Sequence, residues 1–269
     1  MAHNDRPTLW HIAVSHFSEK ARWALEYKSV SHVRRTPPPG VHIPIAYVLS
    51  RGSSFTLPIL ELDGERFADS TDIIAALERR FPEPALYPQD PDERRRALEL
   101  EDWFDEELAP YVRRLGFYEL RRDPELLADV AGRAAPELAA KFGPTLVPYT
   151  RTFVGSRYRA SDAPGAEHAR AKILAALDRL EAELDDREYL VGERFTVADL
   201  TAAALFYPLV LPADGPQFIE RMPAPYEDFR ASVSERPGYR WVQDTFARHR
   251  VPGRYSPSST TIGIPVSNQ

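Results

Sequence analysis

The chain has 269 residues, 43% of them hydrophobic, and a formal net charge of -6, a size and apolar content that suit two globular domains. Because the charges are mixed along the chain, and because no apolar run resembles a membrane span or a signal peptide, we expect a cytoplasmic protein without nucleic acid or membrane as a partner. Cysteine is absent, which excludes disulfides, cysteine-based metal sites and a protein thiol as the nucleophile.

The beginning of the chain predicts a strand, a helix, a second strand and a loop. Residues 8–14 combine aromatic and β-branched side chains, which favours a strand. From Ser18 the apolar residues follow helical spacing, and residues 31–35 return to a strand pattern. Three consecutive prolines then remove backbone donors and restrict φ, so residues 36–50 are expected to form a loop.

A hairpin and a helix complete the predicted first domain. Residues 56–67 have strand patterns on both sides of an Asp-Gly dipeptide, which is a strong turn signal. Either Ser70 or Thr71 is expected to cap the helix that follows. The resulting order of elements is that of an α/β thioredoxin-like domain, which we assign to residues 1–82.

The remainder of the chain predicts an all-α domain. Prolines mark residues 83–92 as a linker, residues 93–249 have long helical periodicity, and residues 250–269 form a Ser-, Thr- and Pro-rich extension. One apolar helix face, kinked at Pro110, is expected to contain Leu100, Trp103, Phe104, Leu108, Tyr111 and Leu115. The apolar face of a helix further along the chain is expected to contain Ile173, Leu177, Leu180 and Leu184. Residues 116–163 give no clear pattern.

Three separated motifs resemble those of the cytosolic glutathione S-transferases. The first is SHFSEKARWAL at 15–25, similar to the family's strand-to-helix junction with serine in the catalytic position. The second is TLPIL at 56–60 with DSTDI at 69–73, and the third is the capping-box segment GERFTVAD at 192–199. The resemblance implies a thioredoxin-like N-terminal domain that binds a thiol and an all-α C-terminal domain that binds an electrophile.

Ser15 is the leading catalytic candidate. It follows the first strand and precedes a helix, where free N–H groups and the helix dipole favour an anion such as a thiolate. A hydroxyl hydrogen bond to a charged acceptor is worth about 1.5 to 3 kcal/mol, enough to lower a thiol pKa by roughly one to two units. A purely structural helix cap is the alternative role for this serine.

Five further residues are expected to bind the thiol. A cis peptide bond before Pro58 would turn the Leu57 backbone toward a peptide-like ligand. Asp69 offers a carboxylate to an amine, and Ser70 offers a hydroxyl and an N–H to a carboxylate. Together these groups suit the γ-glutamyl end of glutathione. Ser18 occupies the position of the second cysteine in dithiol relatives, and it is either a thiol ligand or a helix cap.

Two histidines and three aromatic residues are weaker candidates. His11 lies near the position of the catalytic tyrosine in related classes and could orient a thiolate or transfer a proton, or it could be a structural strand residue. His16 replaces the usual proline and either borders the substrate pocket or is exposed. The electrophile's pocket is expected to include Trp103, Tyr111 and Phe117, although aromatic residues at helical spacing also suit a core.

We expect a metal-free homodimeric enzyme that activates a small thiol for attack on a small electrophile. Only four of the 34 basic residues are lysine, which indicates a GC-rich bacterial genome, and in actinobacteria mycothiol can replace glutathione. The thiol is therefore glutathione or another low-molecular-weight thiol. Two alternatives stay open: a thiol-assisted isomerase, lyase or dehalogenase of a biosynthetic or catabolic pathway, and a non-catalytic ligand-binding module on the same fold.

Overall fold

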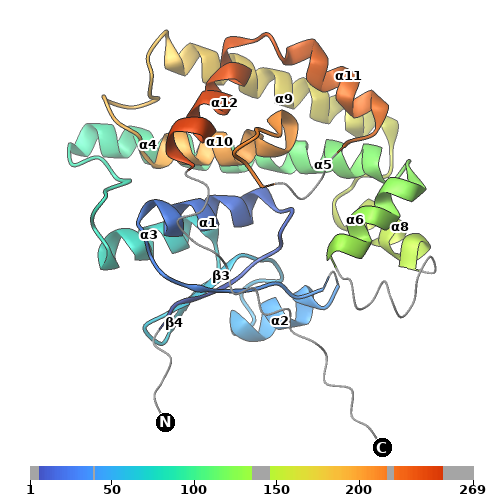
Figure 1. The fold of residues 1–269 in the computed structure, drawn as a ribbon, viewed down its shortest axis with the longest axis horizontal. Coiled ribbons are helices and arrows are strands. Elements are labelled where there is room, and N and C mark those ends of the chain that lie inside the picture. Colours follow the sequence, from blue (N-terminus) through green and yellow to red (C-terminus); the bar gives the residue numbers. More distant parts are fainter. Residues whose placement is uncertain (1–5, 39, 135–145, 217–220, 251–269) are drawn as a thin grey trace, which may run out of the picture.

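The computed structural model describes residues 6–38, 40–134, 146–216 and 221–250. The first domain contains one sheet and three helices (Figure 1). In chain order its elements are β1 (Thr8–Trp10), α1 (His16–Tyr27), β2 (Val33–Arg35), α2 (His42–Leu49), β3 (Ile59–Leu62), β4 (Glu65–Phe67) and α3 (Ser70–Arg80). This is the expected thioredoxin-like domain, with strands shorter than their sequence patterns suggested.

The sheet separates two apolar layers. Its strand order is β2-β1-β3-β4, with β1 parallel to β2 and antiparallel to β3. Leu9 of β1 lies opposite Leu60 of β3, and both side chains belong to the core that continues through α1 into the helical domain. Ile59 points to the other face, where it packs with Ala46 and Leu49 of α2. The sheet is therefore covered on both faces (Figure 1).

Helix α2 corrects the expectation of a loop over residues 36–50. Pro44 is the third residue of α2, and the first four N–H groups of any helix have no acceptor within the helix. A proline in the first turn therefore costs no internal hydrogen bond. The triple proline ends before the helix begins, so it limits only the approach to α2.

The helical domain follows α3 and contains the remaining elements. In chain order they are α4 (Pro91–Glu107), α5 (Ala109–Leu120), α6 (Pro124–Ala134), α8 (Leu146–Arg157), α9 (Ala163–Leu184), α10 (Val197–Val210), α11 (Ala224–Val233) and α12 (Pro237–His249). The single kinked helix expected around Pro110 is two helices that meet at Leu108. Pro110 lies in the first turn of α5, where its missing N–H is tolerated.

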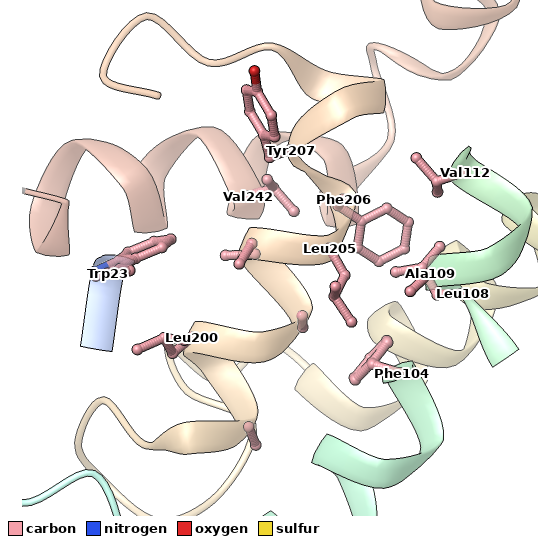
Figure 2. Close-up of a cluster of buried hydrophobic side chains, with 14 of the residues drawn as sticks. Trp23, Phe104, Leu108, Ala109, Val112, Leu200, Leu205, Phe206, Tyr207 and Val242 are labelled. Atoms are coloured by element: carbon pink, nitrogen blue, oxygen red, sulfur yellow. The ribbon is translucent and has the colours of Figure 1, made fainter. Parts of the chain in front are cut away.

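Helix α10 forms the centre of the helical domain. Nearly all of its residues are buried, and it packs against α1 of the first domain as well as α4 and α12. Figure 2 shows Trp23 of α1 on one side of α10, Phe104 of α4 on another, and Val242 of α12 nearby. At its start Thr196 and Asp199 form the predicted capping box. One apolar core therefore joins the two domains.

Among the described residues, no helix has both the length and the apolar character that a membrane span requires.

Candidate functional site

A pocket that is open to solvent lies between the first domain and the helical domain, and its empty space, open mouth included, is about 940 Å³. The first domain contributes the segment after β1, the start of α1 and the segment before β3. The helical domain contributes α5, the end of α8 and the end of α10. The residues that matter most for its chemistry are Ser15, His16, Leu57, Arg113, Phe117 and Tyr158. A site at the junction of two domains is a common place for a small ligand.

Ser15 lies at the pocket and at the N-terminus of α1. Its backbone is extended (φ -76°, ψ 125°), and its Oγ accepts a hydrogen bond from the Ser18 N–H at 3.3 Å. Because that bond uses a lone pair of Oγ, the hydroxyl proton is still available to a ligand. The position thus combines a hydroxyl donor with the positive end of the helix dipole.

Leu57 lines the same pocket as Ser15. The Leu57–Pro58 peptide bond is cis, as predicted. Within the described part of the chain, neither the N–H nor the C=O of Leu57 forms a backbone hydrogen bond. Both groups are therefore free to pair with a peptide-like ligand.

Asp69 and Ser70 form the start of α3, outside the lining of this pocket. The expected cap was Ser70 or Thr71, but Asp69 is the N-cap, and its carboxylate accepts the Thr71 N–H at 2.8 Å. Asp69 is preferred here because a carboxylate offers a charged acceptor to the helix N-terminus. Its side chain is exposed, whereas Ser70 is buried as the first helical residue.

An ionic cluster that the sequence did not predict lies directly behind this helix start. Lys20 of α1 forms ion pairs with Glu101 (2.8 Å) and Asp105 (2.6 Å) of α4, and the hydroxyl of Thr71 lies 3.0 Å from both carboxylates. Burial raises the pKa of both carboxyl groups, and the two carboxylates in turn raise the pKa of Lys20 despite its own burial. The cluster therefore fixes α3 against the helical domain.

The structure does not bring His11 to the pocket. Its Nδ1 lies 2.9 Å from an Arg22 nitrogen, and its Nε2 lies 3.1 Å from the Thr36 hydroxyl. Since arginine only donates, Nδ1 accepts and the ring is the neutral Nε2–H tautomer. Burial and the charge of Arg22 hold the pKa of His11 well below its usual value. The geometry fits the structural alternative for this histidine.

Three other candidates lie outside the pocket lining. Ser18 is fully buried, and its Oγ accepts the Ile12 N–H at 3.1 Å, which holds the segment that leads into α1. Trp103 packs edge-on against Phe104 with Arg179 over its ring. Tyr111 packs against His168 in the same way. Trp103 of α4 and Tyr111 of α5 thus fit the core alternative, because both are partly buried, pack against the hydrophobic core and do not line the pocket.

Phe117 and His16 do line the pocket. The Phe117 ring stacks on Tyr158 with centroids 4.6 Å apart. His16 is buried rather than exposed, and its Nε2 has no hydrogen-bond partner among the described residues. Burial, together with the nearby charge of Arg113, lowers the pKa of His16 to about 3, so the ring is neutral.

Several pocket residues were missed by the sequence reasoning. Arg113 lies four residues before the predicted Phe117 on α5, and this i, i+4 spacing was a signal that both share one helix face. Arg157 and Tyr158 follow in a segment without a clear pattern, and His42 lies in the unpredicted α2. Within the described residues, no group of three or more His, Asp or Glu side chains could hold a metal ion.

Two family models match the chain. Residues 9–85 match the model described as the N-terminal domain of glutathione S-transferase, and residues 139–236 match the model for its C-terminal domain. No curated protein matches the chain.

Solved structures with the same fold come from several bacteria. A theta-class glutathione S-transferase of Xanthomonas axonopodis pv. citri with glutathione bound is 23% identical, with a TM-score of 0.56 over 88% of this chain and 96% of that one. A glutathione S-transferase of Methylobacterium radiotolerans in complex with glutathione sulfonate is 23% identical, with a TM-score of 0.53 over 97% and 99%. The beta-etherase LigF of Sphingobium sp. strain SYK-6 is 19% identical, with a TM-score of 0.56 over 88% and 98%.

Proposed function

Because this chain belongs to the glutathione S-transferase family, we propose that it is a serine-type enzyme that binds glutathione and activates the sulfur for attack on an electrophile. One observation carries the proposal: the Ser15 hydroxyl, at the start of α1, lines the same pocket as the unpaired backbone of Leu57 and the side chains of α5. A thiol held by Leu57 would therefore have its sulfur near a hydroxyl donor and a helix N-terminus.

The proposed chemistry requires only that the thiol be ionised near neutral pH. The Ser15 hydroxyl donates a hydrogen bond to the sulfur, and the α1 dipole favours its negative charge. The thiol proton passes to solvent. The thiolate then forms a carbon–sulfur bond to the electrophile, and a leaving group departs with its electron pair or the electrons move into the acceptor. No protein thiol takes part, since the chain has no cysteine.

The rest of the thiol would be held by the first domain. Leu57 pairs its N–H and C=O with the peptide part, and the cis Pro58 keeps that backbone turned toward the ligand. At the start of α3, the carboxylate of Asp69 pairs with the γ-glutamyl amine, and the N–H and hydroxyl of Ser70 pair with the γ-glutamyl carboxylate. A thiol without this zwitterion would offer no amine to the Asp69 carboxylate, which favours glutathione over mycothiol.

Calorimetric titration and a turnover assay test this proposal together. Glutathione should bind with a millimolar or tighter constant, mycothiol should bind more weakly, and a chlorodinitrobenzene should be conjugated to glutathione at a rate that is first order in enzyme. Tighter binding of mycothiol would contradict the choice of thiol. A flat trace with both thiols, together with no turnover, would leave the non-catalytic ligand-binding module as the function.

The same site also suits a thiol-assisted isomerase, lyase or dehalogenase. Product analysis separates this alternative from conjugation, because an isomerase returns the thiol unchanged whereas a transferase consumes it stoichiometrically.

We also propose that the protein is a cytoplasmic homodimer in which the first domain of one subunit contacts the helical domain of the other. An exposed apolar patch on the first domain supports a protein contact there. Tyr47 and Phe55 stack with ring centroids 5.0 Å apart, and each is about half exposed beside the exposed Val48.

A further inference from the structure

Arg113 places a guanidinium group at the helical-domain side of the pocket, and no described acidic residue pairs with it. Its guanidinium carbon lies 4.9 Å from the Tyr158 ring centroid and 5.8 Å from that of Phe17. Its Nε is buried and has no hydrogen-bond partner among the described residues. Burial lowers the pKa of Arg113, although the group remains charged at neutral pH.

A second arginine lies beside the same aromatic ring. The guanidinium carbon of Arg157, at the end of α8, is 5.6 Å from the Tyr158 centroid, and its charge contributes to the lowered pKa of Arg113. Neither arginine forms an ion pair with an acidic side chain in the described part of the chain, whereas most of the other arginines there do. Two like charges near one pocket repel each other, and a bound anion would be attracted to both.

The other ionisable groups at this end of the pocket add no negative charge. His16 from α1 and His42 from α2 both line the pocket, and burial lowers the pKa of each, with Arg113 and Arg157 respectively adding to the effect. The Nε2 of His16 is buried and unpartnered, so it is available to a ligand. The ionisable groups near the two arginines are therefore neutral rings or the other arginine.

The remaining wall of the pocket is apolar. Val112 and Leu120 of α5, Val130 of α6 and Met222 line it together with the stacked Phe117. A ligand that fits both the apolar wall and the two arginines has an apolar, preferably aromatic, body and one anionic end. Because Ser15 lines the same pocket, such a ligand would meet the thiol sulfur and the arginines at the same time.

We propose that Arg113 and Arg157 bind a carboxylate on the second substrate, so that the preferred acceptors are apolar or aromatic electrophiles that carry a carboxylate. This inference rests on the proposed function, since it names the acceptor class for that reaction. The two cations come from the helical domain, whereas the proposed thiol contacts all come from the first domain. The carboxylate site is thus separate from the thiol site.

A matched pair of electrophiles tests the proposal. 4-Chloro-3,5-dinitrobenzoate and its methyl ester undergo the same reaction: the thiolate forms a carbon–sulfur bond, the carbon–chlorine bond breaks, and chloride leaves with the electron pair. With saturating glutathione, the wild-type KM should be at least about tenfold lower for the carboxylate than for the ester. Arg113→Met should raise the KM for the carboxylate by about tenfold or more and change the KM for the ester by less than about twofold. Arg157→Met should also raise the KM for the carboxylate more than the KM for the ester.

Arg95→Met is the control, because Arg95 lies on the exposed face of α4 and the substitution changes the net charge equally. Equal KM values for acid and ester in the wild type, or a parallel change in the control, would overturn the proposal. So would a rise in the KM for glutathione in Arg113→Met with both acceptors, because that result would assign the arginines to the thiol.

A binding experiment separates failure of this inference from failure of the proposed function. If neither electrophile is turned over, calorimetric titration with the unreactive 3,5-dinitrobenzoate and its methyl ester still reports on the arginines. Selective binding of the acid that is lost in Arg157→Met supports the carboxylate site without any catalysis, and equal binding of both compounds rejects it. Arg157 is exposed, so this variant keeps the test valid if Arg113→Met does not fold.

Discussion

Lys20 of α1 and Glu101 of α4 form an ion pair across the two domains, with 2.8 Å between Nζ and Oε1 and no solvent exposure of either side chain. Oδ2 of Asp105 lies 2.6 Å from the same ammonium group, so one cation forms ion pairs with two carboxylates. Glu101 Oε2 and Asp105 Oδ1 have no hydrogen-bond partner among the described residues. The negative charge of the two carboxylates is therefore compensated by Lys20.

Lys20→Met should destabilise the protein by about 3 to 5 kcal/mol, because it leaves two buried carboxyl groups without their counter-ion. Denaturation in urea at neutral pH measures this loss. Lys172→Met is the matched control: Lys172 pairs with Glu107 at 2.6 Å, but both side chains are partly exposed and solvent screens the pair. A loss in Lys20→Met no larger than in the control would show that the cluster does not hold the domains together.

Ser15→Ala should lower kcat by about tenfold or more, because it removes a hydrogen bond to a charged sulfur. The pKa of bound glutathione, measured from thiolate absorbance, should rise. The variant also loses the cap of α1, which costs about 1 kcal/mol of stability and is checked by thermal denaturation. Ser156→Ala, on the exposed surface of α8, should keep both kcat and the thiol pKa. Unchanged activity and thiol pKa in Ser15→Ala would reject the assignment.

The contribution of neutral, buried His16 to the stability of the protein should be lost as the pH is lowered below 6.5. The pKa of His16 is lowered to about 3, so the unfolded chain takes up a proton below its ordinary pKa while the folded chain does not. The contribution of His16 to the free energy of unfolding is fully present above pH 6.5. At pH 5 the free energy of unfolding is lower by about 2 kcal/mol because of this residue.

Urea denaturation of the wild type and of His16→Gln at pH 7 and pH 5 isolates this effect. Buried His11, His32 and His42 have lowered pKa values too, whereas burial raises the pKa of Asp199 to about 6, so these groups give opposing pH dependences that both proteins share. The wild type should lose about 2 kcal/mol more than the variant. An equal loss in the two proteins would mean that His16 does not stay neutral in the folded state.

His11→Ala should lower the melting temperature but leave kcat within about threefold of wild type, far less than the loss of an acid–base group would cause. The physical reason is that both ring nitrogens are engaged by Arg22 and Thr36 away from the pocket. Steady-state kinetics well below the melting temperature measure kcat. A hundredfold loss would restore His11 as a catalytic residue.

Light scattering at micromolar concentration should give twice the 30.5 kDa mass of one chain. Replacing Phe55 with a charged residue should shift the mass toward the single chain, because the exposed Tyr47–Phe55 pair lies on the surface proposed to contact the partner. Detection of the 30.5 kDa species alone in the wild type would reject the dimer.

Much of the fold was predictable because its signals are local. The Asp63-Gly64 turn has positive φ at both residues, the Leu57–Pro58 bond is cis, and Thr196 starts α10 with a capping box, all within a few residues of the motif that indicated them. The two-domain architecture followed from the change between strand and helix periodicity. Local composition misled the prediction at α2, where the first-turn Pro44 resembled a helix breaker, and at Pro110, which lies in the first turn of α5 rather than at a kink within one helix.

The site was only partly predictable, because its two halves are far apart in the sequence. Ser15 and Leu57 belong to recognisable segments of the first domain, and the sequence alone marked them. No motif in the sequence links Arg113 to Arg157 and Tyr158. Only the packing of α5 beside α8 places the two guanidinium groups next to one ring. An arginine can be paired with an acid, screened by solvent or left facing a pocket, and the outcome depends on the side chains within a few ångströms of it. Long-range contacts of the fold, rather than spacing along the chain, determine which side chains those are.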